Sequence, residues 1–117
     1  MTTHLRVRAG GHELLLPSTS VLHITDNGGD EAVPLLDLPR TLGAAAPGSV
    51  VILYGEEEDA IRLRVDEVIG LVNVPEGMLA RLPVLTSRFA QLFDSITVEA
   101  IEGRHPLCLR ARLAVES

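Results

Sequence analysis

The feature of this sequence that most constrains its fold is a series of short apolar or alternating runs, which turn residues interrupt every ~8–12 residues. Residues 5–8 and 12–16 flank Gly10 and Gly11, and this pattern predicts a β-hairpin. Further runs of strand character lie at residues 21–24, 33–38, 49–54, 60–65, 66–74, 96–101 and 107–113. So many short strands in 117 residues are typical of an all-β domain, built as a sandwich or barrel, and we expect one domain over residues 1–117.

Within this all-β pattern the sequence predicts one or two short helices. Asp37 suits a helix cap and Pro39 a first-turn position, so residues 39–42 are expected to form a helical turn. Residues 87–93 place Phe89, Leu92 and Phe93 at helical spacing. Gly70 lies inside the run 66–74 and predicts a kink or β-bulge there.

Charge and composition exclude several classes of function. The net charge is −6, the ten basic residues are all scattered arginines, and aromatic residues make up 3% of the chain. A nucleic-acid surface needs clustered positive charge and aromatic side chains on which bases stack, so we expect no nucleic-acid binding. No apolar run approaches the ~20 residues of a membrane span, and no leader pattern opens the sequence. We therefore expect a cytoplasmic protein without direct membrane contact.

The residue types that carry chemistry are isolated in this sequence. His4, His12, His23 and His105 stand apart from one another, and no HExxH, CxxC, GxSxG or Walker pattern occurs. The single cysteine, Cys108, lies in an apolar strand and is expected to be a buried, unreactive thiol. We expect no cofactor, no metal and no enzymatic activity, with a small β-barrel enzyme or ligand carrier as the alternative.

Asp66 is the one acidic residue that stands out, because it closes the alternating strand 60–65. Its carboxylate is expected either to cap a turn or to offer a hydrogen bond at the edge of a recognition groove. The acidic run 56–59 has no metal-ligand spacing, and we expect it to be a solvated turn.

Three stretches together resemble the CheW-like family of coupling proteins. The first is residues 8–24, in which Leu16, Pro17 and residues 21–24 (VLHI) fit the family pattern. The others are residues 33–38 (VPLLDL), and residues 50–54 followed by 63–72 (LRVDEVIGLV). Their order and spacing cover nearly the whole chain.

This resemblance implies two interlocked small five-stranded-type β-barrels. Residues 1–45 with the strand at 105–113 would form the first barrel, and residues 49–101 the second. It also implies a scaffold that connects chemoreceptors to a CheA-type histidine kinase, with a groove between the barrels for the receptor's helices. Carried over by position, the receptor-binding groove would contain Val21, Ile24, Val50, Ile61, Val68 and Leu71.

The chain departs from the family between its third and fourth strands, where a longer segment with an Asn-Leu-Arg-Gly turn is usual. The residues that stand there in this sequence are Thr25, Asp26, Asn27, Gly28, Gly29, Asp30, Glu31 and Ala32. We therefore expect a truncated first barrel and a shortened kinase-contact region, as in FrzB-type accessory coupling proteins of Frz chemosensory systems. Such a protein would bind a receptor and modulate array assembly, with weak or absent kinase binding.

Two other interpretations stay open. In the first, the protein is a full adaptor that binds both receptor and kinase. In the second, it completes its shortened barrel by swapping a strand or by pairing with another CheW-like chain.

Overall fold

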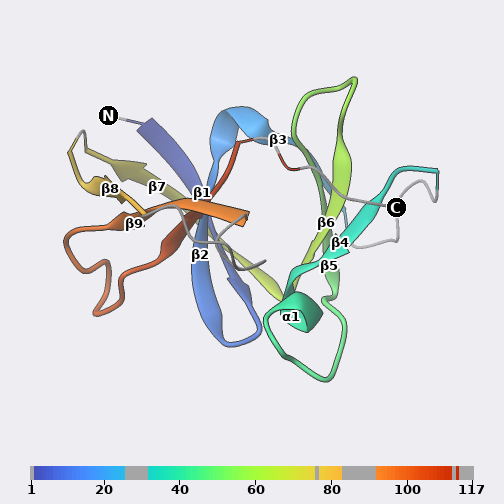
Figure 1. Cartoon of the computed structure of the whole chain (residues 1–117), viewed down its shortest axis with the longest axis horizontal. Helices are drawn as coiled ribbons and strands as arrows, with labels where there is room; N and C mark the ends of the chain where they lie inside the picture. The colour runs from blue at the N-terminus through green and yellow to red at the C-terminus, as the bar shows by residue number, and fades with distance from the viewer. Residues whose placement is uncertain (1, 26–31, 76, 83–91, 112, 114–117) are drawn as a thin grey trace.

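The computed structural model describes residues 2–25, 32–75, 77–82, 92–111 and 113 (Figure 1). The fold is all-β, as the sequence predicts, and contains two short helical turns, of which only the one that follows Asp37 was expected. The strands are β1 (Thr2–Ala9), β2 (His12–Pro17), β3 (Val21–Thr25), β4 (Leu35–Asp37), β5 (Val50–Tyr54), β6 (Ile61–Val65), β7 (Glu67–Val74), β8 (Leu79–Arg81), β9 (Phe93–Thr97) and β10 (Leu107–Leu109). The helical turns are η1 (Ser18–Ser20) and α1 (Leu38–Thr41).

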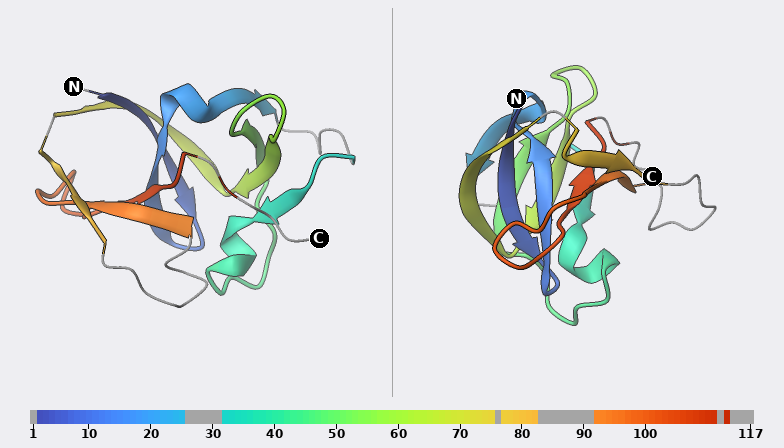
Figure 2. Two further views of the ribbon diagram at one scale, coloured as in Figure 1. Left: turned by 45° about the horizontal axis from the view of Figure 1, so that its top comes forward. Right: turned by 90° about the vertical axis from the view of Figure 1, so that its left-hand side faces the viewer.

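The strands form two sheets, which occupy the two halves of the molecule in Figure 1 and in Figure 2 (left). Sheet A has six strands in the order β7-β1-β2-β10-β9-β8, and sheet B has four in the order β3-β5-β6-β4. Among the described residues the hydrogen-bonded ladders end at β7 and β8 in sheet A and at β3 and β4 in sheet B. Sheet B is thus continuous in sequence and is inserted between two parts of sheet A.

This division of the strands differs from the one that the resemblance implied. Residues 21–25 and 35–37 pair with β5 and β6, whereas they were expected in one unit with residues 1–17. Residues 67–81 and 93–97 belong instead to the sheet of the first hairpin. The physical reason is the ladder between β1 and β7, which runs from Thr2↔Val74 to Arg8↔Glu67 and binds β7 to the start of the chain.

The two sheets share one apolar core. Its fully buried members include, from sheet A, Val7, Leu14, Leu16, Phe93 and Leu109 and, from sheet B, Ile52, Tyr54, Leu63 and Val65. On the other face of sheet A, a smaller cluster contains Leu15, Val74 and Cys108. Cys108 is therefore buried, as expected from its apolar neighbours.

The local predictions hold where the sequence has clear turn or cap residues. The Asp37 side chain caps α1 by accepting a hydrogen bond from the backbone N–H of Arg40 (3.4 Å), and Pro39 lies in the first turn. The hairpin predicted over residues 96–113 is formed by β9 and β10, but β9 already begins at Phe93.

Most of the helix predicted at residues 87–93 lies outside the described residues. No helix in the described ranges has both the length and the apolar character to cross a membrane.

Candidate functional site

A β-bulge interrupts β7, the strand at one edge of sheet A. Val7 of β1 pairs with Val68 and Arg6 pairs with Gly70, so Ile69 is an extra residue with no partner in β1. A bulge of this kind bends the strand and changes which face its side chains occupy. The kink or bulge predicted at Gly70 is thus confirmed.

An equivalent bulge interrupts β3, the strand at one edge of sheet B. Tyr54 of β5 pairs with Val21 and Leu53 pairs with His23, so Leu22 is the extra residue. Both edge strands therefore contain the same arrangement, in which one unpaired apolar residue follows a valine.

In sheet A the bulge places Val68 and Leu71 on the same face of the strand, although residues three apart in a regular strand face opposite sides. Val68 packs against the shared core. Leu71 lies opposite Leu5 in the ladder, and opposed residues share a face of the sheet. The Leu5 side chain is 5% exposed, whereas that of Leu71 is 70% exposed. Leu71 thus extends a row of core residues to the surface.

Sheet B repeats this relationship. Val21 packs against the shared core, and Ile24 lies opposite Ile52 in the β3–β5 ladder. Ile52 is fully buried, while Ile24 is 42% exposed. The core row of sheet B is therefore also extended to the surface at its edge strand.

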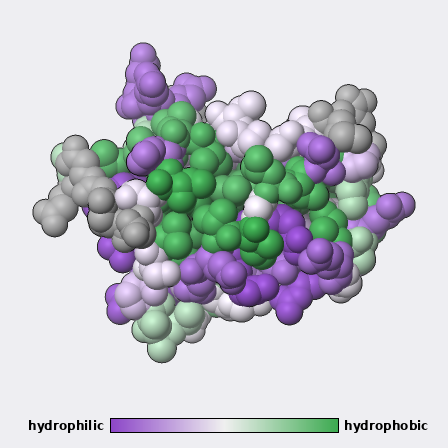
Figure 3. Space-filling view, turned by 180° about the vertical axis from the view of Figure 1, so that it is seen from behind, coloured by the Kyte–Doolittle hydropathy of each residue, from purple (hydrophilic) through white to green (hydrophobic). Residues whose placement is uncertain are grey.

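These features produce an apolar surface, which we call the apolar seam. Figure 2 (right) shows β3 and β7 on the same side of the molecule, the side turned away from the viewer in Figure 1. Figure 3 looks at that side and shows apolar surface continuing across it, with hydrophilic residues below. The exposed large apolar residues of the two strands form the seam: Leu22, Ile24, Ile69 and Leu71. Clustered exposed apolar residues with a polar border are typical of protein-binding surfaces.

A polar pair borders the seam along β7. Thr3 Oγ1 donates to Asn73 Oδ1 at 3.0 Å, two residues after Leu71 and on the same face of the strand. The Arg8–Glu67 pair, with Arg8 Nη1 donating to Glu67 Oε2 at 2.8 Å, lies next to the Val7–Val68 pair in the ladder and so faces the other side of sheet A. An apolar centre with a polar rim is the usual anatomy of a protein interface.

The six groove residues expected from the resemblance occupy three kinds of position. Ile24 and Leu71 are exposed in the seam. Val21, Val50 and Val68 are half-buried and pack against the core. Ile61 is 3% exposed and lies within the core, because β6 runs between β5 and β4 and buries the alternate residues Ile61, Leu63 and Val65. It therefore offers no surface to a partner in this structure.

Leu22 and Ile69 belong to the seam but were not among the expected groove residues. Regular alternation assigns them no special role, because it does not include the bulges. Gly70 was a signal for the bulge at Ile69. No comparable glycine marks the bulge at Leu22.

The carboxylate of Asp66 caps a turn, which is one of its two expected roles. Asp66 Oδ2 accepts a hydrogen bond from the backbone N–H of Gly10 at 2.8 Å, and the Asp66 N–H donates to the carbonyl of Arg8 at 2.8 Å. Ser49 Oγ also donates to the Asp66 carbonyl at 3.0 Å. Asp66 thus joins the β1–β2 turn to the link between the sheets.

The shortened region from Thr25 to Ala32 is only partly described. Thr25 ends β3 and Ala32 is an exposed turn residue, while residues 26–31 lie outside the described ranges. Across the part of the chain that the structure describes, no group of three or more His, Cys, Asp or Glu side chains is placed to hold a metal ion.

No protein-family model and no curated protein matches this sequence. Among solved structures, the chain resembles the crystal structure of the scaffolding protein TtCheW from Thermoanaerobacter tengcongensis, with a TM-score of 0.73 over 95% of this chain and 90% of that one. This chain has the CheW fold. The two sequences are 14% identical, so the likeness concerns the fold, and it confirms the CheW-like all-β fold class that the sequence resemblance implied, though not the expected division of the strands.

Proposed function

We propose that this protein is a non-enzymatic, cytoplasmic coupling protein of a chemosensory system, and that its apolar seam binds the helical signalling region of a chemoreceptor. The CheW fold supports this proposal, together with the three stretches that resemble CheW-like proteins. The observation that carries it is the exposure of Leu71 beside the buried Leu5, at the position where the resemblance expects the receptor groove.

The seam has the physical character that helix binding requires. An amphipathic helix presents an apolar stripe with residues at positions i, i+3, i+4 and i+7, and it needs an apolar surface of matching width. Two edge strands supply apolar side chains from both sheets, and the Thr3–Asn73 pair lies beyond Leu71 on the same face of β7. The seam would bury the apolar stripe and leave the polar flanks of the helix in water.

We further propose that kinase binding is weakened or absent, as in FrzB-type accessory coupling proteins. The support for this is the short segment between β3 and β4, where CheW-like proteins usually have a longer one. In this role the protein would modulate the assembly of receptor–kinase arrays.

Calorimetric titration of the purified protein with a receptor cytoplasmic signalling fragment tests the receptor part. Leu71→Ser should weaken binding about fivefold or more, because a central apolar contact is worth over ~1 kcal/mol. Val98→Ser is the matched control, since Val98 is 57% exposed but lies outside the seam. Equal affinities for the native protein and Leu71→Ser would refute the proposed receptor site.

A parallel titration with a CheA-type kinase tests the kinase part. Little or no heat of binding is expected. Kinase binding of normal strength would show a full adaptor and would overturn the modulator role, while leaving the receptor proposal standing.

A further inference from the structure

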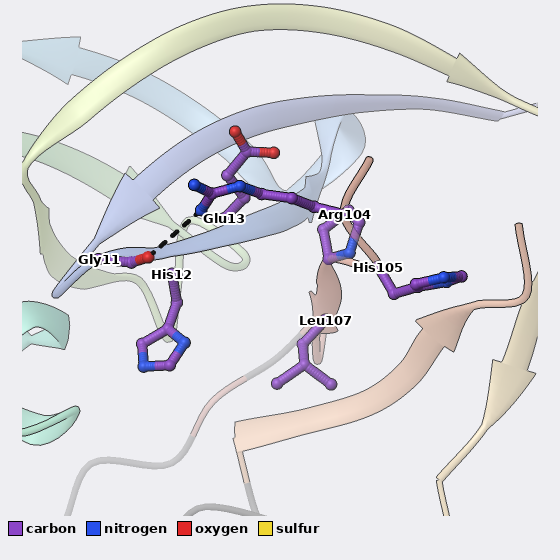
Figure 4. A pocket seen from close by; sticks show the side chains of 7 residues that line it. Gly11, His12, Glu13, Arg104, His105 and Leu107 are labelled. Atoms are coloured by element: carbon purple, nitrogen blue, oxygen red, sulfur yellow. Dashed lines mark hydrogen bonds between the residues drawn. The ribbon is translucent and has the colours of Figure 1, made fainter. Parts of the chain in front are cut away.

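A polar pocket lies at a different place from the seam, between the β1–β2 turn and the segment that leads into β10 (Figure 4). It is an open depression of about 190 Å³. Its lining residues are Gly11, His12, Glu13, Arg104, His105, Pro106 and Leu107. Figure 4 shows Arg104 reaching towards Gly11, with His12 and His105 on opposite sides of Leu107.

The one carboxylate in the lining, that of Glu13, already has cationic partners. Its side chain is 7% exposed, and its oxygens lie 2.8 Å from Arg6 Nη2 and 3.6 Å from Arg8 Nη2. The hydrogen bond from Arg6, together with the nearby charges of Arg6, Arg104 and Arg8, lowers the pKa of Glu13, so this carboxylate is held in its ionised form. Glu13 is thus part of the structural framework below the pocket.

Arg104, at the open side of the pocket, has fewer partners than Glu13 has. Its Nη1 donates one long hydrogen bond, 3.5 Å, to the carbonyl of Gly11. A guanidinium has five N–H donors, and in the described part of the chain no carboxylate lies within 4.0 Å of this one. Arg104 is exposed, so most of its donors remain available to a ligand.

The two imidazoles add polar groups on either side. His105 Nδ1 lies 3.0 Å from the carbonyl oxygen of Thr97, and because a carbonyl only accepts, Nδ1 carries the proton. Nε2 of His105 is then left for another partner. His12 is exposed, and Pro106 and Leu107 provide apolar surface between these groups.

We propose that this pocket is a docking point for the carboxylate side chains of an acidic segment of a partner protein. A guanidinium fork binds a carboxylate in a bidentate geometry, and the apolar floor suits the methylene groups of a glutamate. The chain as a whole has a net charge of −6, which opposes the approach of an acidic segment, so binding depends on the local ion pair with Arg104. This inference does not depend on the proposed receptor site.

Titration of the ¹⁵N-labelled protein with a capped tetraglutamate peptide, followed by NMR, tests this inference. The shift changes are expected at Gly11, His12, Arg104 and His105, and they should diminish with added salt. Arg104→Gln should weaken binding about fivefold or more, the effect of losing one ion pair of ~1 kcal/mol. Arg104→Lys keeps the charge but not the fork and should give an intermediate affinity.

Arg40→Gln is the matched control, because it removes the same charge from another exposed arginine, on α1. Unchanged affinity in this variant, and no shift with a tetraglutamine peptide, would support the pocket as the site. Equal weakening by Arg40→Gln and Arg104→Gln, or shift changes spread over the arginines of both sheets, would overturn the proposal.

Discussion

Leu71 lies directly opposite Leu5 in the β1–β7 ladder, yet its side chain is 70% exposed and that of Leu5 is 5% exposed. The two leucines share one face of sheet A, so the surface at Leu71 continues the core that both sheets form. Ile24 and Ile52 repeat this relationship in sheet B. The candidate site is therefore built from the same rows of side chains that stabilise the fold.

Charged substitutions at Val68 and at Leu71, which lie on either side of the bulge residue Ile69, should have different effects. Val68→Asp places a carboxylate against the core and should destabilise the protein by about 2 kcal/mol or more. Leu71 is exposed, so Leu71→Asp should change stability by less than about 0.5 kcal/mol. The same substitution should abolish receptor binding. Urea denaturation measures the first effect and calorimetric titration the second. A folded Val68→Asp protein of native stability would contradict this account of the bulge.

The Arg6–Glu13 pair should make stability depend on pH. Arg6 lowers the pKa of Glu13 in the folded state, so the stabilisation is present above the ordinary pKa of a glutamate and is lost as the pH falls through the lower, folded value. Glu13→Gln should destabilise the protein by about 1–3 kcal/mol at neutral pH. The same variant should flatten the loss of stability below about pH 5.

Urea midpoints measured at a series of pH values check this dependence. Glu67→Gln is the control, since Glu67 forms an exposed pair with Arg8 and its loss should matter little. If native protein and Glu13→Gln lost stability in parallel on acidification, Glu13 would not be the group responsible.

Cys108 should be unreactive in the folded protein. It is 4% exposed, and burial raises the pKa of its thiol to about 12. Because the thiolate is the reactive form, a thiol reagent such as DTNB should label the native protein very slowly at pH 8 and the urea-unfolded protein rapidly. Equal labelling rates in the two states would show that Cys108 is accessible in the native fold.

Gly48 should tolerate no side chain. A Cβ atom at this position would lie 2.7 Å from the carbonyl oxygen of Val65 and 2.9 Å from its N and C atoms. These are backbone atoms of β6, so they cannot move aside without disturbing the strand. Gly48→Ala should therefore destabilise the protein by about 1–3 kcal/mol. Gly77→Ala is the comparison: its Cβ would lie in open space, so the only loss of stability expected is the cost of placing alanine at a positive φ. Thermal unfolding of the two variants makes the comparison.

The strands and turns were largely predictable, because alternation and glycine–proline breaks are local signals. The hairpin at Gly10 and Gly11, the helical turn after Asp37 and the bulge at Gly70 are all where the sequence predicts them. The pairing of β7 with β1 was not predictable from the residues, because it depends on contacts between segments far apart in the chain. The expected division of the barrels was different for this reason.

The candidate site was predictable only in part, for a related reason. In one sequence an apolar residue at a surface and one in a core look alike, and the distinction rests on which strand lies at an edge. Ile61 and Leu71 are both strand residues of similar hydropathy, but β6 is an inner strand and β7 an edge strand. Leu22 and Ile69 were missed because a bulge breaks the alternation on which strand assignments depend.

The position of β10 affects how the chain reaches its final form during synthesis. This three-residue strand lies between β2 and β9, and it pairs in parallel with a strand from the opposite end of the sequence. All strands of sheet B have been synthesised by residue 65, whereas β9 joins β2 in sheet A only through β10. Sheet A therefore stays in two pieces until residues 107–109 have been made, and a truncation before residue 107 would leave it without the strand that connects them.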